Sequence, residues 1–124
     1  MSKRVLLIDD EDDIREVAGM SLETVAGWTT MAARSGREGV KIAAEQQPDA
    51  ILLDVMMPDM DGPSTFRNLQ ESAATKSIPV ILLTAKAQTR EQRGFRELGA
   101  HGVISKPFDP LTLADQISEI LGWK

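Results

Sequence analysis

The sequence contains no cysteine, which excludes a disulfide framework and any metal site built on thiolates. Long apolar runs are missing as well. Nothing approaches the ~18 residues of a membrane span, and the basic start of the chain leads into only four apolar residues, 5–8, too few for a signal peptide. Positive charge is scarce, since 14 Lys and Arg face 19 Asp and Glu. Contacts to phosphates need clustered Lys and Arg, so the net charge of -5 argues against direct binding to nucleic acid. We therefore expect a cytoplasmic protein with no nucleic-acid or membrane partner.

The length of the chain sets its domain organisation. A sequence of 124 residues buries roughly two thirds of its unfolded surface, which is enough for one core without covalent staples. It contains no internal repeat, low-complexity tract or linker. We therefore expect residues 1–124 to form a single domain.

Five short segments predict β-strands, at 5–8, 28–33, 50–53, 79–83 and 103–105. Those at 5–8, 50–53 and 79–83 are apolar without polar alternation, which is typical of strands buried on both faces near the centre of a parallel sheet. Residues at helical spacing separate the strands and predict five helices, at 12–26, 35–47, 64–74, 87–98 and from about 110. This alternation predicts an α/β fold, a doubly wound parallel sheet covered by helices.

The first predicted helix follows a run of acids. Asp12 or Asp13 is expected to be its N-cap, and Gly27 to end it. Its apolar face at helical spacing comprises Ile14, Val17, Ala18, Ser21, Leu22 and Val25.

Polar residues stand where four of the five strands end: Asp9 and Asp10, Asp54, Thr84, and Lys106. The carboxyl ends of parallel strands line the ligand crevice of an open α/β sheet, so we expect these side chains to converge. Three carboxylates brought together repel one another unless a cation shares them. A site with oxygen ligands alone suits Mg²⁺ at least as well as Ca²⁺.

A lysine and a hydroxyl beside such a metal suit a phosphoryl group, whose charged oxygens need neutralising in the transition state. The attacking oxygen then has to come from a side chain. Asp54, at the end of the central strand, is the candidate nucleophile.

These motifs together resemble the receiver domains of bacterial two-component response regulators, the chemotaxis regulators among them. The resemblance rests on five separated motifs in order and covers about residues 3–123; they are Asp9-Asp10, Asp54, the segment 57–62, Thr84-Ala85 and Lys106-Pro107-Phe108. It implies strand order 2-1-3-4-5 with five helices, a flavodoxin-like three-layer sandwich. It also implies a protein that catalyses only its own phosphorylation and dephosphorylation, with a sensor histidine kinase or histidine phosphotransfer protein as donor and a further protein as target.

The resemblance assigns a role to each matching residue. Asp54 would accept the phosphoryl group from a phosphohistidine. Asp10 and Asp54 would ligate Mg²⁺ together with the backbone carbonyl of Met56, while Asp9 would hold metal-bound water. Thr84 and Lys106 would grip the phosphoryl oxygens.

One position departs from the family pattern. Three residues before the lysine, where the family often has Tyr or Phe, this chain has Val103. A switch that couples movement of the Thr84 hydroxyl to an aromatic ring therefore cannot operate in that form. The Lys106–Pro107 peptide, which is usually cis in the family, is expected to be cis here.

Other functions remain open. A phosphatase that passes through an aspartyl phosphate would need a second acid two residues after the nucleophile, where this chain has Met56. A flavin or nucleotide carrier would need a phosphate-cradling loop after the first strand, where residues 9–13 are all acidic. Within the receiver hypothesis, the chain could be a free-standing regulator, a phosphoryl sink or relay intermediate, or the receiver of a hybrid kinase or transcription regulator.

Overall fold

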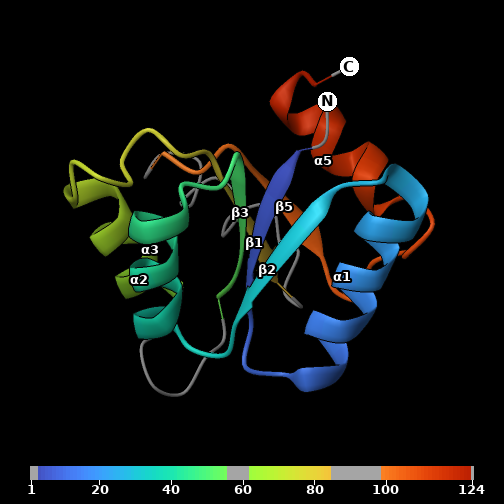
Figure 1. Ribbon diagram of the computed structural model, residues 1–124, viewed down its shortest axis with the longest axis horizontal. Coiled ribbons are helices and arrows are strands. Elements are labelled where there is room, and N and C mark those ends of the chain that lie inside the picture. Colours follow the sequence, from blue (N-terminus) through green and yellow to red (C-terminus); the bar gives the residue numbers. More distant parts are fainter. Residues whose placement is uncertain (1–2, 56–61, 85–98, 124) are drawn as a thin grey trace.

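The computed structural model describes residues 3–55, 62–84 and 99–123 (Figure 1). Its strands are β1 (Arg4–Ile8), β2 (Thr29–Ala33), β3 (Ala50–Asp54), β4 (Val80–Thr84) and β5 (Gly102–Ser105). Its helices are α1 (Asp12–Ala26), α2 (Gly36–Gln46), α3 (Gly62–Glu71) and α5 (Leu113–Leu121). The helix predicted at 87–98 lies outside the described residues.

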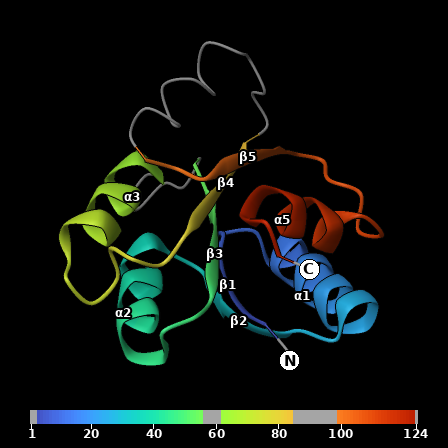
Figure 2. The ribbon, with the colours of Figure 1, turned by 90° about the horizontal axis from the view of Figure 1, so that it is seen from above.

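The strands form one parallel sheet in the order β2-β1-β3-β4-β5. Helices α2 and α3 cover one face, and α1 and α5 cover the other (Figures 1 and 2). The predicted doubly wound, three-layer sandwich and its strand order are therefore confirmed.

The alternation of side chains along each strand explains why the central strands are apolar between their ends. On β1, Leu6 and Ile8 join the core cluster on the α2 and α3 face, whereas Val5 and Leu7 join the cluster on the α1 and α5 face. Successive side chains of a strand point to opposite faces. Because both faces are covered, polar residues occur only at the ends of these strands, at Arg4, Asp54 and Thr84.

The predicted N-cap of α1 is wrong by one residue. Glu11 occupies that position with extended backbone and makes no side-chain cap hydrogen bond. Asp12 and Asp13 lie inside the first turn, where negative charge stabilises the positive end of the helix dipole. Gly27 ends the helix in the left-handed conformation, as predicted.

The apolar face predicted for α1 is wider than the sheet covers. Ala18, Ser21 and Leu22 are buried, but Val17 and Val25 are about half exposed, at 43% and 50%. One helix resting on a sheet buries a single stripe, and the residues at the edge of a broad apolar arc stay in contact with water.

Two other helices have different bounds from those predicted. Helix α3 begins before 64 and ends at Glu71, because the chain then turns and the Thr75 hydroxyl donates to the carbonyl of Leu69, 2.6 Å away. The Thr75 bond takes a carbonyl that a longer α3 would use, so it competes with the helix. Helix α5 begins at Leu113, not near residue 110; residues 110–112 form a turn in which the amide of Thr112 donates to the Asp109 carbonyl at 3.1 Å.

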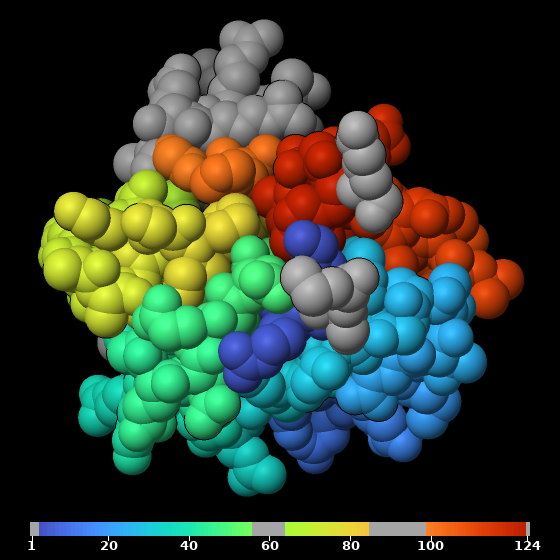
Figure 3. Space-filling model, turned by 45° about the horizontal axis from the view of Figure 1, so that its top comes forward, coloured from blue at the N-terminus to red at the C-terminus, as the bar shows by residue number. Residues whose placement is uncertain are grey.

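The start of β1 (blue) and the end of α5 (red) lie near each other on the face of the molecule shown in Figure 3, on the side where β1 begins (Figures 1 and 3). Trp28 and Trp123 pack edge to face with ring centroids 5.3 Å apart, and Lys3 Nζ lies 4.8 Å from the Trp123 ring. No helix within the described ranges has the length and apolar character needed to cross a bilayer.

Candidate functional site

The register of the sheet brings Asp9 and Asp54 together. Ile8 on β1 pairs with Leu53 on β3, so the next residue of each strand, Asp9 and Asp54, reaches the same level. Leu7 and Leu52, two residues before Asp9 and Asp54, face α1 and α5. Side chains two residues apart on a strand share a face, so both carboxylates lie on the α1 and α5 side of the sheet. Asp9 and Asp54 are almost wholly buried, at 1% and 2% exposure.

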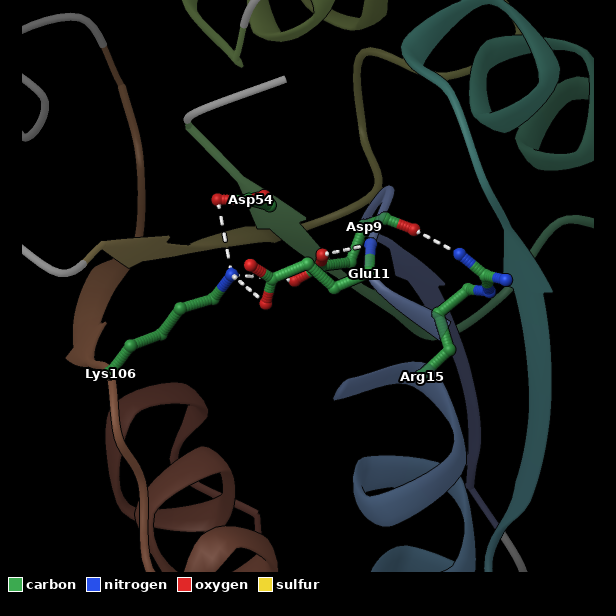
Figure 4. Close-up of polar contacts among 5 residues, drawn as sticks. All are labelled: Asp9, Glu11, Arg15, Asp54 and Lys106. Atoms are coloured by element: carbon green, nitrogen blue, oxygen red, sulfur yellow. Dashed lines mark hydrogen bonds and ion pairs between the residues drawn. The ribbon is translucent and has the colours of Figure 1, made fainter. Parts of the chain in front are cut away.

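Lys106 reaches this pair from the end of β5. Its Nζ lies 2.8 Å from Asp9 Oδ2, 3.3 Å from Asp54 Oδ1 and 3.8 Å from Glu11 Oε2. Glu11 stands at the rim of the sheet, by which we mean the side on which the carboxyl ends of the strands lie. Figure 4 shows the ammonium pointing into the space between these carboxylates. The lysine thus holds positive charge where two buried carboxylates would otherwise repel each other.

The same contacts govern the protonation of Lys106. Burial by itself lowers the pKa of the ammonium, but its close polar contact with Asp9 and the negative charges of Asp9 and Asp54 outweigh that effect. The pKa is therefore raised above its ordinary value of 10.5, and the group stays charged at neutral pH.

Oxygen ligands for a cation gather at the same point. One carboxylate oxygen from each of Asp9, Asp10 and Asp54 lies within 4.8 Å of the other two. Asp9 Oδ2 is buried, and although it is ion-paired with Lys106 it accepts no well-formed hydrogen bond from residues 3–55, 62–84 or 99–123. The formal charges of these three carboxylates and the Lys106 ammonium sum to -2. Charge, donor type and spacing therefore fit a hard divalent cation.

Thr84 and Lys106 are tied together through the backbone. Thr84 pairs with Ser105 across β4 and β5, and the amide of Lys106 donates to the Thr84 carbonyl at 2.9 Å. The Thr84 side chain is buried. The Lys106–Pro107 peptide is cis, as expected. Met56, whose backbone carbonyl was expected to ligate the metal, lies outside the described residues.

The sequence matches the response regulator receiver domain family over residues 5–118. This chain belongs to that family. It is 35% identical over 121 residues to the phosphate regulon transcriptional regulatory protein PhoB of Pseudomonas aeruginosa, an alignment that covers 98% of this chain and 52% of PhoB. The receiver thus spans about half the length of the curated relatives it matches.

Solved structures agree with this assignment. Chemotaxis protein CheY4 of Vibrio cholerae superposes with a TM-score of 0.89 at 29% identity, covering 97% of this receiver and 99% of that chain. The receiver domain of a sensor histidine kinase from Pseudomonas aeruginosa, solved with a magnesium ion coordinated in its active site cleft, superposes with a TM-score of 0.85 at 26% identity, covering 98% and 99%.

Two residues at the rim, Arg15 and Glu11, contribute to the site but were not predicted from the sequence to do so. Arg15 Nη1 donates to the backbone carbonyl of Asp9 at 2.7 Å, and the Glu11 amide donates to Asp9 Oδ1 at 2.9 Å. The spacing of Asp12 and Arg15, three apart on a helix, does signal the ion pair that they form. The contact of Arg15 with Asp9 depends on the turn between them, which no spacing rule describes.

An apolar groove of about 320 Å³ runs along α1 from Glu16 to Val25. Its walls are the outer face of α1 and the loop that follows Lys106, tied together by a hydrogen bond from the Ser21 hydroxyl to the Pro110 carbonyl. Among the described residues, the large apolar side chains that are exposed all line this groove; they are Val17, Met20, Val25 and Leu111.

Val103 packs, partly buried, against the core cluster on the α2 and α3 face of the receiver. It therefore fills core space without offering the ring that the family often has there. Residues 85–98, which include the helix predicted at 87–98, lie outside the described residues.

Proposed function

We propose that this receiver accepts a phosphoryl group on the side-chain carboxylate of Asp54, in a reaction that depends on Mg²⁺. The observation that carries the proposal is the position of Lys106 Nζ, 3.3 Å from Asp54 Oδ1 and 2.8 Å from Asp9 Oδ2, in a pocket that three acids share. A buried lysine that touches the acceptor oxygen is well placed to meet the charge that arrives with a phosphoryl group.

In the proposed step, a carboxylate oxygen of Asp54 attacks phosphorus, a new P–O bond forms, and the P–N bond to the donor histidine breaks. In the phosphohistidine that reacts, the other ring nitrogen carries a proton. The electron pair of the P–N bond stays on the nitrogen that held phosphorus, so the donor leaves as a neutral imidazole. Lys106, which pairs with Asp54 before transfer, turns to the phosphoryl oxygens. The Thr84 hydroxyl donates a further hydrogen bond to them.

Asp10 and Asp54 would hold Mg²⁺ with the backbone carbonyl of Met56, and Asp9 would hold a metal-bound water. The ion would neutralise charge on the transferring group. The excess of two negative charges in the pocket supports this assignment. The side chains of the cluster, Asp9, Asp10 and Asp54, offer carboxylate oxygens, which are the ligands that Mg²⁺ prefers.

We propose a sensor histidine kinase or a histidine phosphotransfer protein as the donor. The apolar groove supports a protein donor, because a partner seated over the rim would also reach the outer face of α1, which begins at the rim with Asp12. Covering Val17, Met20, Val25 and Leu111 would remove their apolar surface from water.

We propose that output occurs through protein contacts made by this segment. Several relatives are transcriptional regulatory proteins about twice as long. The net charge of -5 argues against contact with nucleic acid for these 124 residues only. A role as phosphoryl sink, relay intermediate or receiver of a hybrid kinase rests on the same chemistry.

Intact-mass measurement tests the proposed function. The protein is incubated with acetyl phosphate and Mg²⁺, beside a sample without metal, the variant Asp54→Asn, and the control Asp49→Asn, which changes an exposed acid at the opposite end of β3. We expect one added phosphoryl group in wild type and in Asp49→Asn only. Labelling of Asp54→Asn to the wild-type level would rule out Asp54 as the acceptor.

A further inference from the structure

Arg15 is almost buried beside the acidic pocket but touches none of the five side chains to which we have assigned roles. Its side chain is 13% exposed. One guanidinium nitrogen donates to the backbone carbonyl of Asp9 at 2.7 Å, and the other is paired with Asp12. Figure 4 shows Arg15 and Lys106 approaching Asp9 from opposite sides.

The contacts of Asp9 show what this guanidinium does. The Asp9 amide donates to the Ala33 carbonyl at 3.1 Å, which fixes the chain on the side of β2. The Asp9 carboxylate is engaged by the Glu11 amide and by Lys106. The remaining polar group of Asp9 is its carbonyl, and Arg15 holds it.

That carbonyl belongs to the peptide that joins Asp9 to Asp10. A peptide is planar, so fixing the direction of its C=O also fixes the direction of the next N–H and the position of the next Cα. Asp10 is exposed and, unlike Asp9, has no described side-chain contact that orients it. Its place within the acidic cluster therefore depends on the peptide that Arg15 holds.

We propose that Arg15 is a positioning residue for the divalent cation: it orients the peptide between Asp9 and Asp10, and so presents the Asp10 carboxylate to the ion. This inference rests on the proposed function, because it concerns the same cation site. Arg15 does not itself touch the ion or the phosphoryl group.

Electrostatics alone predicts the opposite result, which makes the proposal testable. Arg15 is a positive charge close to a cation site, so its removal should tighten Mg²⁺ binding if charge were all that mattered. Loss of a group that orients a metal ligand typically weakens binding by roughly 10–100-fold. The sign of the change separates the two accounts.

The experiment measures Mg²⁺ affinity by calorimetry for wild type, Arg15→Met, Arg15→Lys and Arg34→Met. Arg34 is exposed and directly follows β2 at the same rim, so Arg34→Met removes a nearby positive charge without touching the Asp9 carbonyl. The amide resonance of Asp10 in metal-free protein gives a second readout that needs neither metal nor activity. The Mg²⁺ dependence of labelling by acetyl phosphate gives a third.

We expect Arg15→Met to bind Mg²⁺ roughly tenfold more weakly and to shift the Asp10 amide resonance. Its labelling by acetyl phosphate should need roughly tenfold more Mg²⁺ to reach half of its maximal rate. Arg15→Lys keeps the charge but cannot hold the Asp9 carbonyl and Asp12 together. Its affinity for Mg²⁺ should therefore lie between those of wild type and Arg15→Met, and this variant provides the test if Arg15→Met does not fold. Arg34→Met should bind Mg²⁺ as well as wild type or slightly better.

Mg²⁺ binding that is unchanged or tighter in Arg15→Met, or wild-type binding in Arg15→Lys, would overturn the inference. Either result, with wild type binding Mg²⁺ and accepting a phosphoryl group, would leave the proposed function intact. A wild-type protein that failed to bind Mg²⁺ would instead overturn the proposed function and this inference together.

Discussion

Replacing Lys106 with methionine removes the cation that the acidic pocket uses when no metal is bound. The ammonium lies within 3.3 Å of both buried carboxylates, Asp9 and Asp54. Methionine keeps the unbranched chain and much of its volume but brings no charge. In Lys106→Met the two carboxylates face each other without their nearest counter-charge.

Removing one partner of a buried ion pair costs about 3–5 kcal/mol, because the other partner remains buried and unpaired. The pocket opens to water at Asp10 and Glu11, which are exposed, so we expect the lower end, roughly 3 kcal/mol. A domain of this size is stable by only about 5–15 kcal/mol. The loss should therefore be plain in an equilibrium unfolding curve.

Mg²⁺ should reverse part of this loss. The cation and Lys106 compete for the same carboxylates and repel each other by roughly 1–3 kcal/mol at the effective dielectric of a partly open site. Lys106→Met should therefore bind Mg²⁺ about tenfold more tightly than wild type, which corresponds to about 1.4 kcal/mol. Added Mg²⁺ should stabilise the variant more than it stabilises wild type.

Urea unfolding with and without Mg²⁺ measures both effects. Lys41→Met, the same substitution at an exposed position of α2, is the matched control and should change neither stability nor its response to Mg²⁺. If metal-free Lys106→Met were as stable as wild type, or if Mg²⁺ stabilised the two equally, Lys106 would not be balancing the carboxylates.

Three further predictions follow from the same structure. Because the pKa of Lys106 is raised, its contribution to stability is complete below pH 10.5 and is lost as the pH rises through the pKa of the folded state. The stability difference between wild type and Lys106→Met should therefore be constant around neutral pH and become smaller above pH 10.5. A difference that already became smaller at neutral pH would contradict this. Gly39→Ala on α2 would press a methyl group into the buried side chain of Ile8, so it should lower the free energy of unfolding by about 1–3 kcal/mol, despite the higher helix propensity of alanine. Val17→Glu and Leu111→Glu place charge in the apolar groove. Each should slow transfer from a phosphohistidine protein by roughly tenfold or more but leave labelling by acetyl phosphate unchanged. An equal loss of rate with both donors would refute a docking role for the groove.

Much of the fold is readable from the sequence because both faces of the sheet are covered. The unbroken apolar runs of β1, β3 and β4 identify central strands, and the polar residues that end them identify the rim. The strand order came only from the resemblance to receivers, because periodicity within a strand carries no information on its neighbours. The register then explains why Asp9 and Asp54 meet, since Ile8 lies beside Leu53.

Features that depend on local turns were not predictable in the same way. Asp12 and Asp13 are better capping residues than Glu11 by preference, yet the cap falls on Glu11, where its amide serves Asp9. Helix α5 begins only at Leu113, after a turn in which the Thr112 amide donates to the Asp109 carbonyl. In each case hydrogen bonds between residues two or three apart set the turn before the helix, and helical periodicity does not describe such turns.

The most direct test of the account is to locate the phosphoryl group on the chain. Protein labelled with acetyl phosphate and Mg²⁺ is treated with borohydride, which reduces an acyl phosphate to the alcohol and so marks the residue that carried it, and the digested peptides are then sequenced by mass spectrometry. The account predicts homoserine at position 54 and nowhere else. Modification at Asp9 or Asp10 with Asp54 unchanged would contradict it.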